Sequence, residues 1–405
     1  MTSDMEADVL IVGGGMVGTT LAVALASADV PVAIIDRDTL DQIAHPIRDG
    51  RASAIASGSQ AVLDVLGIWP RVAADAQPIL QVRVSDADSL LFLHYDHRDI
   101  GDKPLGAIVE NHVIHRALNA RLAALPHARA IGGRTVAALE RDAHRATAIL
   151  DDGARVTARL AIAADGRNSP LRRAAGIDVV EWRYPQTGIV CTVRHERDHR
   201  GIAHERFLPA GPFAILPLPG KRASLVWTER ADIAKTILAL DDAAFAAELG
   251  LRFGDFLGAL EVEGARYAHP LSLLHAQSYI APRLALAGDA AHAIHPIAGQ
   301  GLNLGLRDVA ALAEVIVDAL RLGLDPGSTA VLAGYERWRR FDNTVMMAVT
   351  DSLNRLFSNR STPLRLARDT GLAAVNRMPG LKRLFMRHAM GLVGDLPRLV
   401  RGQAL

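Results

Sequence analysis

The chain has 405 residues, of which 50% are hydrophobic and 22% are charged, so it is long enough for two or three globular units and for burying a large cofactor. Its 45 Lys and Arg residues balance 44 Asp and Glu residues, and the net charge of +1 argues against a nucleic-acid-binding or an intrinsically disordered protein. The single cysteine, Cys191, excludes an intramolecular disulfide, is expected to lie in the core, and fits a reducing compartment such as the cytoplasm.

The first forty residues predict a strand, a helix and a second strand. Residues 8–12 are a short β-branched apolar run, residues 16–27 are rich in alanine and leucine, and residues 31–36 resume the strand pattern. The uncharged stretch 9–28 is as long as a membrane span. Its glycines and the acidic residues before it argue against both a span and a signal peptide.

Three glycines and one carboxylate in this unit form a dinucleotide-binding pattern. Gly13 would permit a tight turn, Gly15 would let the backbone approach a pyrophosphate, and Gly18 would let the helix pack closely on the strand. The phosphates would lie at the helix N-terminus, and Asp36 would accept hydrogen bonds from a ribose. NAD, FAD and other ligands share this pattern, and a simple glycine-rich turn is the alternative, so the pattern does not select the cofactor.

Two later segments also place a carboxylate at the end of a strand. Asp165 and Gly166 follow the apolar run 160–164, at the edge where α/β sheets bind ligands, although an ordinary turn is the alternative. Gly288 and Asp289 follow the run 284–287, and a long helix is expected beyond Gly299.

The loop before that long helix has the features of a flavin-binding segment. Gly299 and Gly301 would let the main chain lie flat against a planar ring. The helix N-terminus would offer donors and positive potential to the anionic edge of a reduced isoalloxazine. His292 and His295 have a spacing that occurs in metal sites, but no further ligand follows nearby, so no metal is predicted.

In this order the motifs resemble those of the group A FAD-dependent aromatic monooxygenases, which have the para-hydroxybenzoate hydroxylase fold, over nearly the whole chain. The resemblance implies that the first βαβ unit binds the ADP half of FAD, Asp165 contacts the pyrophosphate and the nicotinamide cofactor, and Gly288 and Asp289 hold the ribityl chain. It also implies a loop beside the flavin ring, formed by His295, Pro296, Gly299, Gln300, Gly301 and Asn303.

Within that superfamily the chain is more similar to the ubiquinone-biosynthesis hydroxylases. Arg51 and Asn111 match positions that contact FAD in that family. The phrases that carry the similarity are 49–55 (DGRASAI), 109–111 (VEN), 182–186 (WRYPQ), 205–218 (ERFLPAGPFAILPL) and Asp342 with Asn343.

The resemblance implies an FAD-dependent hydroxylase of a polyprenylphenol that is a ubiquinone precursor. NADH or NADPH would bind transiently and reduce FAD, and O2 would form a C4a-hydroperoxyflavin that hydroxylates the ring. His295, Pro296 and Gln300 are candidates beside the ring, and no tyrosine is assigned a catalytic role. Three alternatives stay open: a hydroxylase of a small soluble aromatic, a reductase of isoprenoid double bonds, and a noncatalytic flavin-binding component of a quinone-biosynthesis complex.

The expected fold is α/β, with a Rossmann-like FAD-binding domain, an inserted, mainly antiparallel β-sheet domain for the substrate, and a C-terminal helical region. The strand around Phe213 should form a pocket wall facing the flavin, and Phe207, Phe213 and Trp227 are candidate pocket residues, with plain core positions as the alternative. The predicted domain limits are 1–75, 100–180 and 266–345 for FAD, 76–99 and 181–265 for the substrate, and 346–405 for the helical region.

The C-terminal region is basic. Residues 351–405 contain ten Lys and Arg and three Asp residues, a net +7, so the first 350 residues carry −6. A helical face there either packs on the FAD domain or contacts a partner or an anionic membrane, which would make the protein peripheral on the inner face of a membrane. The apolar face comprises Leu381, Leu384, Phe385, Ala389 and Leu392, and Lys382, Arg383 and Arg387 lie off it.

Overall fold

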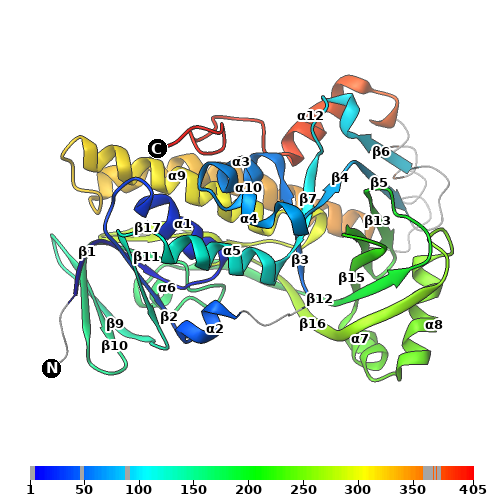
Figure 1. Ribbon diagram of the computed structural model, residues 1–405, viewed down its shortest axis with the longest axis horizontal. Helices are drawn as coiled ribbons and strands as arrows, with labels where there is room; N and C mark the ends of the chain where they lie inside the picture. Colours follow the sequence, from blue (N-terminus) through cyan, green and yellow to red (C-terminus); the bar gives the residue numbers. More distant parts are fainter. Residues whose placement is uncertain (1–4, 46–49, 87–91, 359–367, 369–370, 372–374) are drawn as a thin grey trace.

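The computed structural model describes residues 5–45, 50–86, 92–358, 368, 371 and 375–405 (Figure 1). Its first sheet has eight strands, and five of them run parallel in the order β18, β11, β1, β2, β8. The strands of this sheet are β1 (Met5–Val12), β2 (Val32–Asp36), β8 (Ala128–Gly132), β9 (Val136–Arg141), β10 (Ala146–Leu150), β11 (Arg155–Ala163), β17 (Ile280–Ala281) and β18 (Leu284–Leu286).

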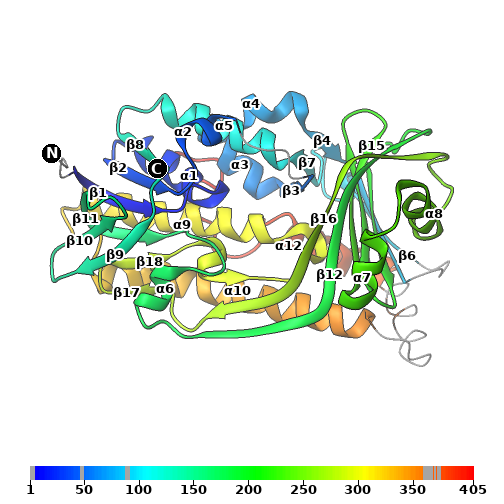
Figure 2. The ribbon, with the colours of Figure 1, turned by 90° about the horizontal axis from the view of Figure 1, so that it is seen from below.

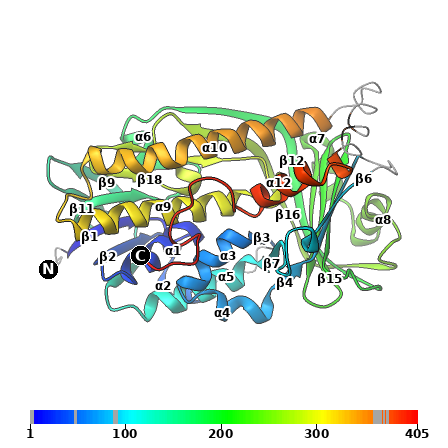
Figure 3. The ribbon, with the colours of Figure 1, turned by 90° about the horizontal axis from the view of Figure 1, so that it is seen from above.

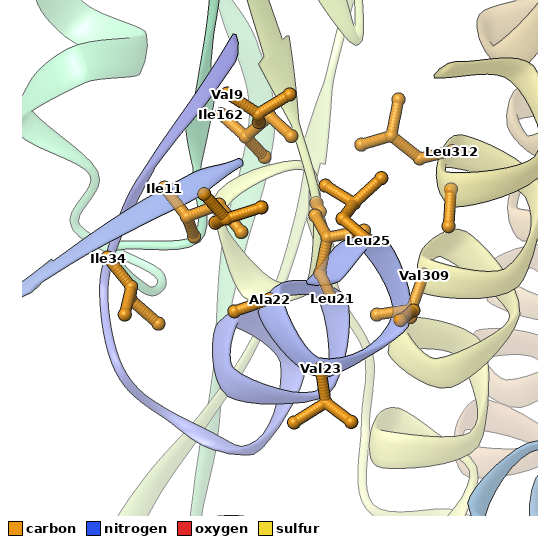
Figure 4. Close-up of a cluster of buried hydrophobic side chains, with 14 of the residues drawn as sticks. Val9, Ile11, Leu21, Ala22, Val23, Leu25, Ile34, Ile162, Val309 and Leu312 are labelled. Carbon is orange, nitrogen blue, oxygen red and sulfur yellow. The ribbon is translucent and has the colours of Figure 1, made fainter. Parts of the chain in front are cut away.

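The N-terminal prediction of strand, helix and strand is confirmed by β1, α1 (Met16–Ala26) and β2. α1 has a high alanine and leucine content and is buried along most of its length, because it lies between the first sheet and α9 (Gly301–Arg321). Figure 4 shows this core: side chains of α1 meet those of the strands on one side and those of α9 on the other. The labelled members are Val9, Ile11, Leu21, Ala22, Val23, Leu25, Ile34, Ile162, Val309 and Leu312.

A small antiparallel sheet and several helices extend this domain. The sheet has the order β3, β7, β4, and the helix α10 (Thr329–Phe357) packs along α9. The bounds of these elements are β3 (Ala52–Ala56), β4 (Gln77–Ile79), β7 (Gly106–Glu110), α2 (Leu40–Ala44), α3 (Ser57–Val65), α4 (Trp69–Val72), α5 (Asn111–Ala123) and α6 (Pro170–Ala174).

The second large sheet has eight strands in the order β19, β16, β12, β15, β14, β13, β5, β6, and it is antiparallel except for the pair β13 and β5. α7 (Ala231–Leu238) and α8 (Asp242–Phe253) cover one of its faces through a separate hydrophobic core. The strands are β5 (Gln81–Asp86), β6 (Phe92–Asp96), β12 (Val179–His195), β13 (Ile202–Leu208), β14 (Gly211–Leu218), β15 (Arg222–Arg230), β16 (Leu260–Ala276) and β19 (His292–Ala293).

Two strands of 17 residues each, β12 and β16, connect the two large sheets in space. Figure 2 shows both strands running from the region of α6 and β18 to the antiparallel sheet. The predicted domain limits at residues 180 and 265 fall inside these two strands. The domain division stays a prediction.

The C-terminal region ends in α12 (Pro379–Ala389) and a segment that returns to α9 and α10. There the Trp338 indole N–H donates to the carbonyl of Asp395 at 2.8 Å, and Leu399 and Val400 join the main core. Helix α12 buries Met386, whereas Leu384 and Phe385 of the predicted apolar face are 52% and 44% exposed. The interpretation in which that face packs on the FAD domain is therefore wrong for these two residues.

Candidate functional site

In the turn between β1 and α1, the room around each of the three glycines is that expected of a dinucleotide-binding turn. A Cβ at Gly13, where φ is +109°, would lie 2.2 Å from the carbonyl oxygen of Ala164, and one at Gly18 would lie 1.9 Å from that of Gly13. A Cβ at Gly15 would meet nothing within 4 Å. The turn is thus closed toward the strands and open at the N-terminus of α1, where no side chain caps the free N–H groups.

Asp36 lies at the end of β2 beside this turn. Its carboxylate accepts hydrogen bonds from the backbone N–H groups of Gly14 and, at 2.7 Å, Asp38. Because a carboxylate offers about four lone-pair positions, each oxygen keeps capacity for a ribose hydroxyl.

Arg51 and Asn111 are brought together by the pairing of β3 with β7. The backbone N–H of Asn111 donates to the carbonyl of Arg51 at 2.9 Å, and its side-chain oxygen accepts from the Ser53 hydroxyl at 2.7 Å. The Arg51 side chain is exposed, whereas that of Asn111 is buried. Asp49, part of the same motif, lies outside the described residues.

Asp165 lies directly after β11, which pairs with β1, so its loop borders the glycine turn. Burial raises the pKa of its carboxyl. One oxygen accepts from the backbone N–H of Leu171 at 3.3 Å, and the other is buried without a partner in the described structure. An orphaned acceptor here fits a ligand that donates hydrogen bonds.

Arg172, which the sequence reasoning missed, joins the Asp165 loop to the Gly288 loop. This buried guanidinium donates to the carbonyls of Ala290 at 2.7 Å and Arg167 at 2.9 Å. The one feature that distinguishes Arg172 from the other arginines of this segment is its burial. The sequence does not show burial, so it gave no signal for this residue.

Gly288 and Asp289 form a 3-10 turn, Gly288–Ala290, directly after β18. Gly288 has φ +60°, and its N–H donates to the Asp308 carboxylate at 3.1 Å. Protein surrounds Asp289 closely enough to raise the pKa of its carboxyl by desolvation, yet its side chain stays accessible to solvent. That combination is expected of a group that lines a deep crevice.

Behind this turn lies a buried cluster of ion pairs centred on Asp308 of α9. Its carboxylate contacts the His292 ring at 2.5 Å and the Arg339 guanidinium at 3.0 Å. Burial alone would raise the pKa of Asp308, but His292 and Arg339 lower it to about 2. Arg339 and Arg307 both bind Asp342, and the Asn343 amide also donates to Asp308, at 3.2 Å. The pair Asp342 and Asn343, which the sequence resemblance singled out, therefore supports the turn from α10.

The loop of residues 295–300 and the start of α9 are the segment that the sequence analysis predicts to lie beside the flavin ring. Asn303 fixes this loop to β3, because its amide nitrogen donates to the carbonyls of Ala54 and Gly299 and its oxygen accepts from the N–H of Ala56. Pro296 is exposed, and a Cβ at Gly301 would meet nothing within 4 Å. α9 begins at Gly301 without a side-chain cap or an acidic first turn, so its N-terminus is open to an anion.

Gln300 and Gly299 hold the end of this loop in place. Gly299 has φ +60° and packs against Ala54, and the buried Gln300 amide donates to the carbonyl of Ala389, the last residue of α12, at 3.4 Å. Gln300 thus connects the flavin half to the C-terminal helix.

His295 is fully buried, and neither of its ring nitrogens has a hydrogen-bond partner in the described part of the chain. Burial lowers the pKa of His295 to about 4, so the ring is neutral at physiological pH. It lies edge-on to Tyr184, with ring centroids 5.1 Å apart, and the Tyr184 hydroxyl donates to Asp351 at 2.8 Å. Tyr184 had no assigned role, and only the tertiary structure brings it to the loop.

The structure separates the three candidate pocket residues. Phe213 and Trp227 pack against each other, and Trp227 packs on Phe245 of α8, so both belong to the core on the outer face of the antiparallel sheet. Their prediction as pocket residues is corrected on that ground. Phe207 lies on the opposite face, stacked on Phe357 at 4.1 Å, and belongs to one buried cluster with Phe357 and Ile297 of the 295–300 loop. It stays a candidate.

These groups fit FAD. An open glycine turn on α1, an acid at the end of β2, an orphaned oxygen on Asp165 and an uncapped α9 lie along the carboxyl edge of one parallel sheet, where α/β folds bind dinucleotides. Within the described residues no three His, Cys, Asp or Glu side chains are grouped to hold a metal ion.

Comparison with known proteins agrees with this geometry. A family model described as "FAD binding domain" matches residues 6–349. The chain is 53% identical to the ubiquinone hydroxylase UbiL of Rhodospirillum rubrum, over all of this chain and 95% of that protein. It is 37% identical to the 3-demethoxyubiquinol 3-hydroxylase of Escherichia coli, over 96% of this chain and all of that one. The p-nitrophenol 4-monooxygenase PnpA of Pseudomonas putida shares the fold, with a TM-score of 0.82 at 21% identity, over 97% and 99% of the two chains.

Replacing Gly18 by alanine should destabilise the protein and abolish FAD retention. The new Cβ would overlap the Gly13 carbonyl, and overpacking of this kind typically costs roughly 1–3 kcal/mol. Gly250→Ala in α8 is the matched control, because a Cβ there meets nothing and helix propensity should add up to about 1 kcal/mol. Thermal unfolding and FAD absorbance of the purified variants check both. An FAD-loaded Gly18→Ala protein of unchanged stability would contradict the packing argument.

Asp308→Asn should lower the free energy of unfolding by about 3–5 kcal/mol, because it leaves Arg339 buried with an incomplete set of charges. The lowered pKa of Asp308 makes its contribution fully present above about pH 4, and the contribution is lost as pH falls toward 2. The difference in melting temperature between the parent and the variant should therefore become smaller as the pH is lowered from 7 to 3. Asp232→Asn, in an exposed pair with Arg230, should change little. Equal melting temperatures for Asp308→Asn and the parent at pH 7 would refute this.

Proposed function

The chain belongs to the ubiquinone-biosynthesis hydroxylase family of FAD-dependent aromatic monooxygenases, and we propose that it hydroxylates the aromatic ring of a polyprenylated ubiquinone precursor with NAD(P)H and O2. One observation carries the reaction type. The uncapped N-terminus of the long helix α9 lies directly after a loop whose backbone is held in place by the Asn303 amide. The names of the full-length relatives support the substrate class.

Bound FAD would supply the activation of dioxygen and the oxygen atom that is transferred to the ring. The first N–H groups of α9 would stabilise negative charge at the edge of the reduced ring. The Asp308 cluster would keep the ribityl-binding turn at a fixed distance from that helix, because the Gly288 N–H of the turn donates to the carboxylate of Asp308, a residue of α9 that is also paired with Arg339 of α10. Burial of His295 and Ile297 would limit the access of water to the ring.

The side of the antiparallel sheet that faces the 295–300 loop is suited to an apolar substrate. Phe207, Ile297 and Phe357 form one buried cluster there, with Val84 and Leu353 packed against it. A ring bound between this face and the loop would lie next to the flavin. The reductant would bind transiently at the open edge near Asp165, because the sequence contains one GxGxxG turn only.

A polyprenylphenol should stimulate NAD(P)H oxidation by the FAD-loaded protein, whereas hydroxybenzoates should not. The product should carry one oxygen-18 atom when the reaction runs under oxygen-18 gas. Oxygen uptake, NAD(P)H absorbance and mass spectrometry of the product measure this. Turnover of hydroxybenzoates alone would favour a soluble substrate, a product without oxygen-18 would indicate a reductase, and the absence of turnover with any phenol would leave a noncatalytic flavoprotein.

A peripheral membrane contact is the second part of this proposal. None of the helices in the described part of the chain has the length and apolarity required to cross a bilayer. Instead, α10 and α12 both lie on the side of the molecule seen in Figure 3, and each combines exposed apolar side chains with exposed arginines. The apolar ones are Phe341, Val345, Val349, Leu384 and Phe385, and the arginines are Arg337, Arg340, Arg383 and Arg387.

The orientation of α12 is set by one ion pair together with the burial of Met386. Lys382 binds Asp99 at 2.7 Å, so this basic side chain faces the protein while Leu384 and Phe385 face outward. Exposed apolar and basic side chains on one helix are typical of helices that lie in the interface of anionic membranes. A substrate with a polyprenyl tail would be drawn from such a surface.

The double variant Leu384→Glu, Phe385→Glu should lose most of its flotation with vesicles that contain anionic lipid. It replaces apolar contact area with negative charge on a solvent-facing surface, so FAD content and melting temperature should not change. Leu251→Glu, at a side chain of α8 that is 79% exposed, is the matched control and should float like the parent. Equal flotation of both variants, or none by the parent, would exclude this surface.

A further inference from the structure

Glu205 lies on the face of the antiparallel sheet that shares a buried cluster with the 295–300 loop. It lies in β13, opposite Val84 of β5 and Ala214 of β14. Side chains alternate along a strand, so Glu205 shares a face with Phe207 and points away from His204 and Arg206. Phe207 shares a buried hydrophobic cluster with Ile297 of the 295–300 loop and Phe357 of α10, and Glu205 lies about 7 Å along the strand from Phe207.

Glu205 has no hydrogen bond and no ion pair with any residue of the described structure. The adjacent basic side chains are engaged on the other face of the sheet: the His204 ring packs on Phe256 at 4.7 Å, and Arg206 donates to the carbonyl of Arg252 at 2.6 Å. Desolvation by burial raises the pKa of Glu205 to about 8. The side chain nevertheless keeps part of its surface accessible, as expected of a carboxyl that lines an internal space.

The charged groups on the neighbouring elements are paired with other partners. On β5 the charged side chain of this face is Asp86, which binds Arg368 at 2.7 Å. On α10 Asp351 is held by Tyr184 and Arg355. The neighbours on β14 are apolar: Pro212, Ala214 and Leu216.

A carboxyl that is buried without a partner costs folding free energy and is uncommon as a purely structural element. Groups of this kind, with a perturbed pKa and a place beside a cofactor loop, are typical of acid–base residues. Phenols need such a residue, because the phenolate ring is far more electron-rich than the neutral phenol.

We propose that the Glu205 carboxylate is the base that accepts the hydroxyl proton of the phenolic substrate, an inference that rests on the function proposed above. The O–H bond of the phenol breaks, an O–H bond forms on the carboxyl, and the electron pair stays on the phenolate oxygen. The electron-rich ring then takes the oxygen atom that NAD(P)H and O2 supply through the cofactor. The ring carbon loses its proton to restore aromaticity, and Glu205 releases its own proton to solvent before the next turnover.

The test uses the FAD-loaded Glu205→Gln protein, because glutamine keeps the shape and cannot titrate. For the parent, kcat/KM should rise as pH increases through about 8, where the base form of Glu205 accumulates. The glutamine variant should lose this rise and should be slower by roughly 10²–10⁴-fold above pH 8. Glu205→Asp should keep the rise with reduced rate, and the rate of FAD reduction by NAD(P)H should be the same in all three proteins.

A second readout is independent of turnover. A short-chain prenylphenol bound to the parent at pH 9 should give a near-ultraviolet difference spectrum of a phenolate, although a free phenol with a pKa near 10 is mostly neutral there. Bound to Glu205→Gln, it should give the spectrum of the neutral phenol. Charging of Glu205 above its raised pKa disfavours the folded state, so the glutamine variant should also melt at an equal or higher temperature at pH 9.

Glu229→Gln is the matched control, since Glu229 is a buried glutamate on the outer face of the same sheet, beside Arg252. It should retain the pH rise and the phenolate spectrum. If the parent turns over polyprenylphenols and Glu205→Gln keeps the same pH profile and phenolate spectrum, the role of Glu205 is overturned and the proposed function stands. A parent that turns over no polyprenylphenol would overturn the proposed function itself.

Discussion

The buried carboxylate of Asp308 is the constraint on which the proposed flavin half of the site depends. A charge with no exposed surface is tolerated only when its partners are all in place, and Asp308 takes them from three further parts of the chain. His292 comes from β19, the Gly288 N–H from the turn after β18, and Arg339 and Asn343 from α10. Satisfying this carboxylate therefore fixes the Gly288–Ala290 turn, which we propose to hold the ribityl chain, relative to α9, whose N-terminus would offer positive potential to a reduced flavin.

The half of the site that we propose to bind ADP is positioned by close backbone packing instead of by ion pairs. A side chain on Gly13 would overlap the Ala164 carbonyl, so the glycine turn and the strand that delivers Asp165 can approach each other only without a Cβ. The parallel order β2, β1, β11, β18 brings Asp36, the glycine turn, Asp165 and Gly288 to one sheet edge in that sequence. Arg172 then connects the two halves by donating to the carbonyl of Ala290. A dinucleotide bound along this edge would contact all four motifs at once.

The sequence predicted what is local and missed what depends on long-range pairing. Strand ends, the glycine turn and the start of α9 follow from short patterns, and the structure has them at the expected residues. The partners of Asp308 lie up to 35 residues away on another helix, and no spacing rule pairs them. Phe213 and Trp227 were misassigned for a related reason: alternation along a strand defines two faces, but only the helices packed on one of them reveal which face is the core. The exposure of Leu384 and Phe385 likewise depends on contacts between distant segments, namely the ion pair of Lys382 with Asp99 and the burial of Met386.

The outer face of the antiparallel sheet forms a hydrophobic core, and the inner face lies toward the 295–300 loop. This difference limits the positions at which substitutions can change substrate specificity. The outer face is filled by aromatic side chains under α8, so substitutions there would alter stability before chemistry. On the inner face, Phe207 shares a buried cluster with Ile297 of the 295–300 loop. The unpaired Glu205 lies on the same face, two residues before Phe207 in β13. A ring held between this face and the flavin would be oriented by the sheet and oxidised from the loop side. The position of the new hydroxyl group can therefore change through a few inner-face side chains while every FAD-binding motif stays the same.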